Sequence, residues 1–113
     1  MVAIDDPITV QAVRFIRDHV DDGISVKDVQ ANAGRSRTDL EQRFRHWLKT
    51  SIRGEIVRRR MERVCLLLRQ TGLPLNEIAR RTGFNTTSQF CRLFHGQLGC
   101  TPSQYRQSYK VRH

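Results

Sequence analysis

The stretch IRGEIVRRRMERVCLLLRQ, residues 52–70, determines how the rest of this chain is organised. Beyond Gly54 it contains no strong helix breaker, and its apolar side chains recur at helical spacing, as Ile56, Val57, Met61, Val64, Leu67 and Leu68. Thr71-Gly72 and Pro74 then end the pattern. We therefore predict one long helix of roughly 28 Å, with a similar small helical unit on each side of it.

The composition favours a polyanionic partner. The 113 residues carry a formal net charge of +9, the sequence pI is about 10.7, and arginine far outnumbers lysine. This balance suits DNA or RNA first and an acidic membrane surface second. The length allows one compact domain, or two very small ones that share a helix.

The sequence lacks the signatures of membrane and secreted proteins. No apolar run approaches the ~20 residues of a membrane span, and the start MVAIDDPITV has neither the basic nor the apolar region of a signal peptide. The three cysteines, Cys65, Cys91 and Cys100, include no Cys-x-x-Cys pair, so we expect free thiols. We expect a soluble, intracellular protein.

The first unit has the pattern of a helix-turn-helix. Residues 9–20 predict a supporting helix that stops at residues 21–23, Asp-Asp-Gly. Residues 25–28, Ser-Val-Lys-Asp, have the form of a capping box and open a short helix that ends at Gly34. Residues 36–39, Ser-Arg-Thr-Asp, repeat that signature and open a second helix.

This second helix is amphipathic. Its apolar face carries Leu40, Phe44, Trp47 and Leu48, and its other face carries Thr38, Glu41, Gln42 and Arg45. A polar, partly basic face on a short helix suits insertion into the DNA major groove. A solvated surface helix would show the same pattern.

The second unit repeats this plan. Residues 75–82 predict a short helix, Gly83-Phe84 a turn, and residues 86–97 a second helix with Asn85 as N-cap. A last short helix covers residues 102–107, and the remaining tail carries no packing signal. The second unit aligns with the first at an offset of 49 or 50 residues, although any two amphipathic helix pairs align to some degree. We predict subdomains over residues 7–50 and 72–108, a linker helix over 51–71 and a tail over 109–113.

One long spaced motif resembles a known family. Residues Ile78-Ala79, Gly83-Phe84, Ser88, Phe90, Arg92, Phe94, Gly99, Thr101-Pro102 and Tyr105-Arg106 resemble the signature of the AraC/XylS transcription regulators. The resemblance implies an all-α fold of about seven helices, in which two helix-turn-helix subdomains joined by a long linker helix read adjacent major grooves of DNA. It also implies a bacterial cytoplasmic protein.

A narrower resemblance, to regulators of xylose operons, covers Asp6-Pro7, Gln11-Ala12, Phe15-Ile16-Arg17, His19, Gly23-Ile24, Val26 and Ser36-Arg37. It implies an activator of a sugar-catabolism operon, with a sugar-sensing domain preceding this chain. The sequence departs from the family at Pro74, Gln89 and Gly96. Because Gly96 lowers helix stability by ~1 kcal/mol, we expect the second recognition helix to be held less firmly than the first.

The resemblance implies DNA contacts from both recognition helices. The first helix supplies Arg37, Thr38, Glu41, Gln42 and Arg45, and the second supplies Thr86, Thr87, Ser88, Gln89 and Arg92. Glu41 would accept from cytosine, Gln42 would pair with adenine, and arginine would read guanine. Thr86 and Thr87 would hold phosphate. The alternative for each residue is a cap or a solvated position.

Other basic and metal-type residues have simpler interpretations. Some of Arg58, Arg59, Arg60 and Arg63 neutralise phosphates, or they are solvated or paired with Glu55 and Glu62 at helical spacing, and we favour the second interpretation for at least two of the four. Cys91 and His95 lie four residues apart on one helix face, but the third and fourth metal ligands would have to come from Cys100 or distant residues, so we predict no metal and no cofactor. No catalytic motif is present, which argues against an enzyme.

We therefore predict sequence-specific binding to double-stranded operator or promoter DNA, with RNA polymerase as a further expected partner and no membrane partner. The alternative is a basic helical module that docks a protein partner such as RNA polymerase, with its charge serving solubility.

Overall fold

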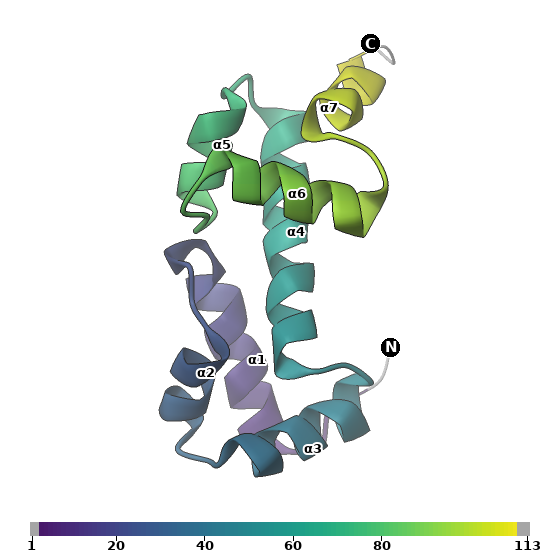
Figure 1. Cartoon of the computed structure of the whole chain (residues 1–113). Helices are drawn as coiled ribbons and strands as arrows, with labels where there is room; N and C mark the ends of the chain where they lie inside the picture. Colours follow the sequence, from purple (N-terminus) through teal and green to yellow (C-terminus); the bar gives the residue numbers. More distant parts are fainter. Residues whose placement is uncertain (1–2, 111–113) are drawn as a thin grey trace. The chain divides into compact units, whose positions relative to one another are not determined.

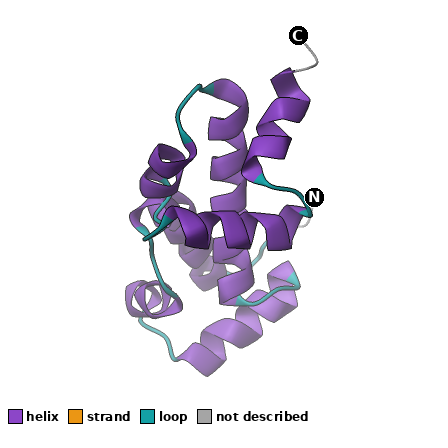
Figure 2. Ribbon diagram, turned by 45° about the horizontal axis from the view of Figure 1, so that its top comes forward, coloured by secondary structure: helices purple, strands orange, loops and turns teal. Residues whose placement is uncertain are grey.

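In a computed structural model that describes residues 3–110, the chain is all-α (Figure 1). The described part forms seven α-helices and one 3-10 turn: α1 (Pro7–His19), η1 (Val20–Asp22), α2 (Val26–Ala33), α3 (Arg37–Leu48), α4 (Ile52–Gln70), α5 (Leu75–Arg81), α6 (Thr87–Leu98) and α7 (Pro102–Lys110). Short loops join the helices, and the described residues contain no strand (Figure 2). The predicted fold class is confirmed, and α4 has the predicted bounds.

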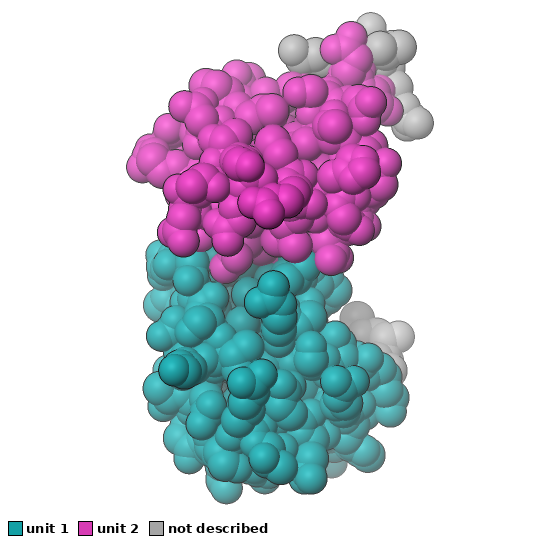
Figure 3. All heavy atoms as spheres, viewed as in Figure 1, with its two compact units in different colours: residues 1–59 teal, residues 60–113 magenta. Residues whose placement is uncertain are grey.

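The chain divides into two compact units, residues 1–59 and residues 60–113 (Figure 3). The boundary lies inside α4, so this one helix contributes its first turns to one unit and its last turns to the other. In the first unit α2 and α3 form a helix-turn-helix supported by α1, and in the second α5 and α6 do so beside α7.

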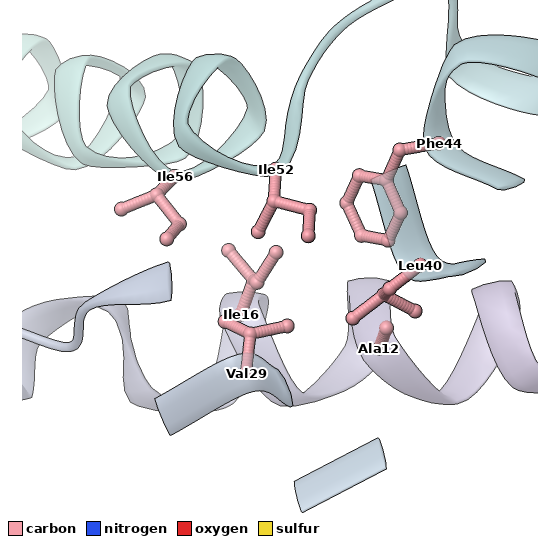
Figure 4. Packing of buried hydrophobic residues seen from close by; sticks show 7 residues of the cluster. All are labelled: Ala12, Ile16, Val29, Leu40, Phe44, Ile52 and Ile56. Carbon is pink, nitrogen blue, oxygen red and sulfur yellow. The ribbon is translucent and has the colours of Figure 1, made fainter. Parts of the chain in front are cut away.

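The core of the first unit joins four helices. Its buried residues are Ala12, Ile16, Val29, Leu40, Phe44, Ile52 and Ile56. Figure 4 shows Ile52 and Ile56 of α4 pointing toward Ile16 of α1, beside Phe44 of α3. Because the first turns of α4 complete this core, the beginning of the linker helix is an integral part of the first unit.

Caps set the ends of α2 and α3. The Ser25 hydroxyl accepts from the Asp28 backbone N–H, and the Asp28 carboxylate accepts from the Ser25 N–H, which completes the predicted capping box. Gly34 ends α2 in the left-handed conformation, with φ 65°. The second predicted box is only half formed. The Ser36 hydroxyl accepts from the Asp39 backbone N–H, but the Asp39 carboxylate accepts from Arg43 Nε at 3.1 Å.

The core of the second unit is rich in aromatic side chains. Its buried apolar residues are Met61, Val64, Leu68, Ile78, Ala79, Phe84, Phe90 and Phe94. Ring centroids are 5.4 Å apart between Phe84 and Phe90 and 5.6 Å apart between Phe94 and Tyr105, in edge-to-face arrangements. These contacts link α6 to the preceding turn and to α7.

Arg106 closes the connection between α4 and α5. Its guanidinium donates to three backbone carbonyls, those of Leu68 at 3.3 Å, Thr71 at 3.2 Å and Leu73 at 2.7 Å. Carbonyls at a helix C-terminus lack partners within the helix, so this side chain stabilises the end of α4 from α7.

Two local predictions in the second unit are wrong. The N-cap of α6 is Thr86 rather than Asn85, because the Thr86 hydroxyl accepts from the Gln89 backbone N–H at 3.0 Å. Helix α7 continues beyond Gln107 to Lys110, with the ring of Tyr109 packed 5.0 Å from that of Tyr105. The rest of the predicted tail, residues 111–113, lies outside the described residues.

Candidate nucleic-acid interface

The predicted contact residues of α3 lie together on one surface. Arg37, Thr38, Gln42 and Arg45 are exposed, and Glu41 is partly buried. All five line a shallow, open hollow of about 520 Å³. The opposite side of the helix places Leu40 and Phe44 in the core with no exposed surface. The 3.6-residue period therefore divides α3 into a buried apolar face and a polar face turned to solvent.

Glu41 differs from its neighbours in its bonding. Its Oε1 accepts from the backbone N–H of Ile52 at 2.8 Å, and its Oε2 lies 3.8 Å from Arg37 Nε. The Glu41 side chain is 26% exposed, against 68% for Arg37. The structure thus shows a structural bond for Glu41, which the sequence does not indicate because its partner is eleven residues away.

The polar face of α6 is similar but less free. Ser88, Gln89 and Arg92 are exposed, whereas Thr87 is partly buried. The exposed Thr86 hydroxyl caps the helix, and the Gln89 side-chain oxygen accepts from the Asn85 backbone N–H at 3.2 Å. Thr86 and Gln89 are thus engaged in capping, while Ser88 and Arg92 project from the exposed face. The contact roles of all ten predicted residues remain predictions.

The start of α6 has the electrostatics of an anion site. The first backbone N–H groups of a helix carry a partial positive charge, and Thr86 and Thr87 place hydroxyl groups there. This arrangement suits a DNA phosphate, as the resemblance implies. The capping bond to Gln89 leaves the Thr86 hydroxyl able to donate to such an oxygen.

Some of the four arginines of α4, Arg58, Arg59, Arg60 and Arg63, have partners within the protein. Glu55 is only 1% exposed, and its carboxylate accepts from Arg58 at 2.8 Å and from Arg59 at 3.1 Å. The guanidinium of Arg60 lies 5.2 Å from the centroid of the Phe84 ring. Arg58 and Arg59 thus pair with Glu55, in agreement with the prediction that at least two of the four arginines are solvated or paired. The burial of Glu55 was not foreseen.

On α5 a second carboxylate accepts from two arginines, an arrangement called here the Glu77 fork. Glu77 accepts from Arg80 and, at 3.0 Å, from Arg81. Hydrogen bonds from Arg80 and then from Arg81 lower the pKa of Glu77 to about 2. The short helix thereby holds two arginines against one carboxylate at its exposed surface.

The remaining candidate residues have simple environments. Cys65, Cys91 and Cys100 are free and partly buried. Across residues 3–110, no three His, Cys, Asp or Glu side chains gather as metal ligands. No described helix is both long and apolar enough to cross a membrane.

Comparison with known proteins places the chain among transcription regulators. A helix-turn-helix domain family matches residues 29–108. The xylose operon regulatory protein of Escherichia coli (strain K12) is 34% identical over 104 residues, which cover 92% of this chain and 26% of that protein. The chain therefore spans about a quarter of the length of this relative.

Solved structures agree with this placement. The xylose-binding transcription activator XylR has a TM-score of 0.82 and 32% identity, covering 96% of this chain and 28% of that one. The DNA-binding domain of AdpA, a global transcriptional factor solved with a target DNA, has a TM-score of 0.87 and 27% identity, covering 96% and 97%. The chain therefore belongs to the AraC/XylS family of helix-turn-helix transcription regulators, as a DNA-binding domain and not an enzyme.

Proposed function

We propose that this domain binds one asymmetric DNA half-site in a sequence-specific manner, with α3 and α6 in successive major grooves. The observation that carries the proposal is the division of both helices into a core face and an exposed polar face. Each recognition helix is long enough to reach the base edges along a major groove, because both contain 12 residues.

The linker helix supports a two-groove arrangement. Helix α4 contains 19 residues and so extends for roughly 28 Å. Successive major grooves on one face of B-DNA are ~34 Å apart, which is the same order as the length of this helix.

Within this proposal the exposed residues divide into two classes. On α3, Arg37, Gln42 and Arg45 carry the long side chains that reach base edges, and on α6 Arg92 has the same role. Thr86 and Thr87 bind phosphate and set the register of α6 on the duplex. Base contacts determine which sequence is preferred, whereas phosphate contacts strengthen binding to every sequence.

We also propose a regulatory context. The similarity to a xylose operon regulator and to a xylose-binding activator supports a role in activating a sugar-catabolism operon such as that for xylose. A sugar effector would bind outside this chain, and RNA polymerase is a further partner of such an activator. A cytoplasmic location, on the nucleoid when DNA is bound, follows from this role.

Salt dependence of binding tests the proposal against a basic protein-interaction module. Affinity for a labelled duplex is measured by fluorescence anisotropy from about 50 to 200 mM salt, and each neutralised phosphate contributes about −0.9 to the logarithmic slope. We expect a slope corresponding to several phosphates. A slope near zero, or no binding, would favour the protein-interaction module.

A further inference from the structure

The Glu41 carboxylate joins the first recognition helix to the first residue of the linker helix. Glu41 lies on the polar face of α3, yet its Oε1 accepts from the Ile52 backbone N–H at 2.8 Å. The N–H groups of a first helical turn have no acceptor within their own helix. In α4 two of them have side-chain acceptors, since Gly54 N–H donates to the Ser51 hydroxyl at 2.9 Å.

Both the side chain and the backbone N–H of Ile52 are held in place. Its side chain has no exposed surface and packs in the core with Phe44 of α3 and Ile16 of α1 (Figure 4). Its N–H is held by a charged acceptor, which forms a stronger hydrogen bond than a neutral one. Together these contacts fix α3 against the first turn of α4.

The bond to Ile52 restricts direct reading of a base. A carboxylate oxygen can accept from two donors, but while Oε1 is held on the Ile52 N–H, the Glu41 side chain is only 26% exposed, against 68% for Arg37. The second oxygen, Oε2, lies 3.8 Å from Nε of Arg37, which is one helical turn away on the same face. Each carboxylate oxygen of Glu41 thus has a partner within the first unit, Ile52 N–H for Oε1 and Arg37 for Oε2.

We infer that Glu41 is a positioning residue for DNA recognition and not a base-reading one. It holds α3 at a fixed orientation on the N-terminus of α4 and keeps Arg37 beside it on the exposed face. The inference rests on the proposed function and assigns to Glu41 a role different from that of Gln42, Arg45 and Arg37 within it.

Three variants separate the possible roles. Glu41→Gln keeps an oxygen acceptor for Ile52 N–H but removes the charge, and Glu41→Ala removes both. Ser51→Ala is the matched control, because it removes the other side-chain acceptor in the same turn of α4 without touching α3. The readouts are amide hydrogen exchange by NMR and base preference by selection from a random duplex library.

Hydrogen exchange tests the bond itself. In Glu41→Ala, the Ile52 amide should exchange at least about tenfold faster, while the Gly54 amide stays within about twofold of the unmodified domain. Ser51→Ala should show the reverse, and Glu41→Gln should leave both amides protected. Unchanged exchange of Ile52 in Glu41→Ala would overturn the inference whether or not the domain proves to be sequence-specific.

Base preference tests the role in recognition. We expect Glu41→Ala to lose about tenfold in the ratio of specific to random affinity, spread over the positions read by α3, and Ser51→Ala to keep that ratio. Glu41→Gln should restore the original preference. A change of the preferred base at a single position in Glu41→Gln would instead identify Glu41 as a base reader. If the unmodified domain selects no sequence, the proposed function fails, and the exchange data still test the bond.

Discussion

The guanidinium of Arg43, in the middle of α3, donates from Nη1 to both carboxylate oxygens of Asp6, at 2.9 and 2.8 Å. Asp6 also accepts from the Thr9 hydroxyl at 2.6 Å and precedes the first residue of α1. The Arg43 side chain extends along the protein side of α3 and is only 29% exposed. The start of the chain is thereby tied to the first recognition helix from the side opposite its polar face.

Removing this tie should destabilise the first unit. The Thr9 hydrogen bond and then the Arg43 guanidinium lower the pKa of Asp6 from its usual value of 3.8. Asp6→Asn should reduce the free energy of unfolding by ~1 kcal/mol at pH 7, since it weakens charged hydrogen bonds. Urea unfolding measures the change. Asp5→Asn, which alters the exposed neighbouring residue, is the control and should have no effect.

Acid should weaken the Glu77 fork. A carboxyl group whose folded-state pKa is depressed stabilises the fold above its unfolded pKa, and this stability is lost as pH falls. For Glu77 this stability should be lost as the pH falls from about 4.5 to about 2. As the pH is lowered across this range, the unfolding midpoint of Glu77→Gln should therefore fall less than the unfolding midpoint of the unmodified domain. An equal fall of the unfolding midpoint in the two proteins would show that the bonds from Arg80 and Arg81 to Glu77 contribute nothing to stability.

Arg106 should stabilise the fold through the geometry of its hydrogen bonds and not through its charge alone. Because its guanidinium donates to three carbonyls in and just after the last turn of α4, Arg106→Ala should lower the free energy of unfolding by about 2 kcal/mol. Arg106→Lys keeps the charge but cannot reach the three carbonyls with one fork, so it should recover only part of the loss. Thermal unfolding followed by circular dichroism measures both. Full recovery in the lysine variant would contradict this role.

Gly96 is a position where stability can be gained. It lies within α6, is exposed, and a Cβ atom added there would meet nothing within 4 Å. Gly96→Ala should therefore stabilise the domain by ~1 kcal/mol through helix propensity alone. Gln97→Ala, at the next exposed position, is a control with a much smaller expected change. A destabilised Gly96→Ala variant would show that the glycine serves another purpose.

Arg92 should discriminate between sequences. Arg92→Ala should weaken binding to the selected site by ~1–3 kcal/mol while leaving random DNA less affected. Arg17→Ala provides the control, because Arg17 is an exposed arginine on α1 that pairs with Asp18 at 3.6 Å. Competition binding with selected and random duplexes gives both values. Equal losses on the two duplexes would assign Arg92 to phosphate.

Periodic features of the sequence predicted the architecture well. The apolar spacing within residues 52–70 gave the bounds of α4, and the capping box at Ser25 with Gly34 marked both ends of α2. Such signals are local, because they depend on which residues share a helix face or a helix end. The polar faces of α3 and α6 follow from the same period.

Features that depend on distant partners were not predictable. The bond from Glu41 to Ile52 and the fork of Arg106 connect residues that no local pattern relates. The buried position of Glu55 also escapes a pattern that assigns charged residues to the surface. At α6 the error was of another kind, since Asn85 and Thr86 are both good N-caps and only the backbone geometry chooses between them.

Selection of bound sequences from a random duplex library, by the purified domain at near-physiological salt, tests the central claim most directly. Two recognition helices in successive major grooves predict two preferred blocks separated by about one helical turn, ~10 base pairs centre to centre. Substitutions at Arg37 or Gln42 should then alter one block, and Arg92→Ala the other. A single block affected by both sets of substitutions, or no enrichment at all, would contradict a domain that reads DNA with two helices.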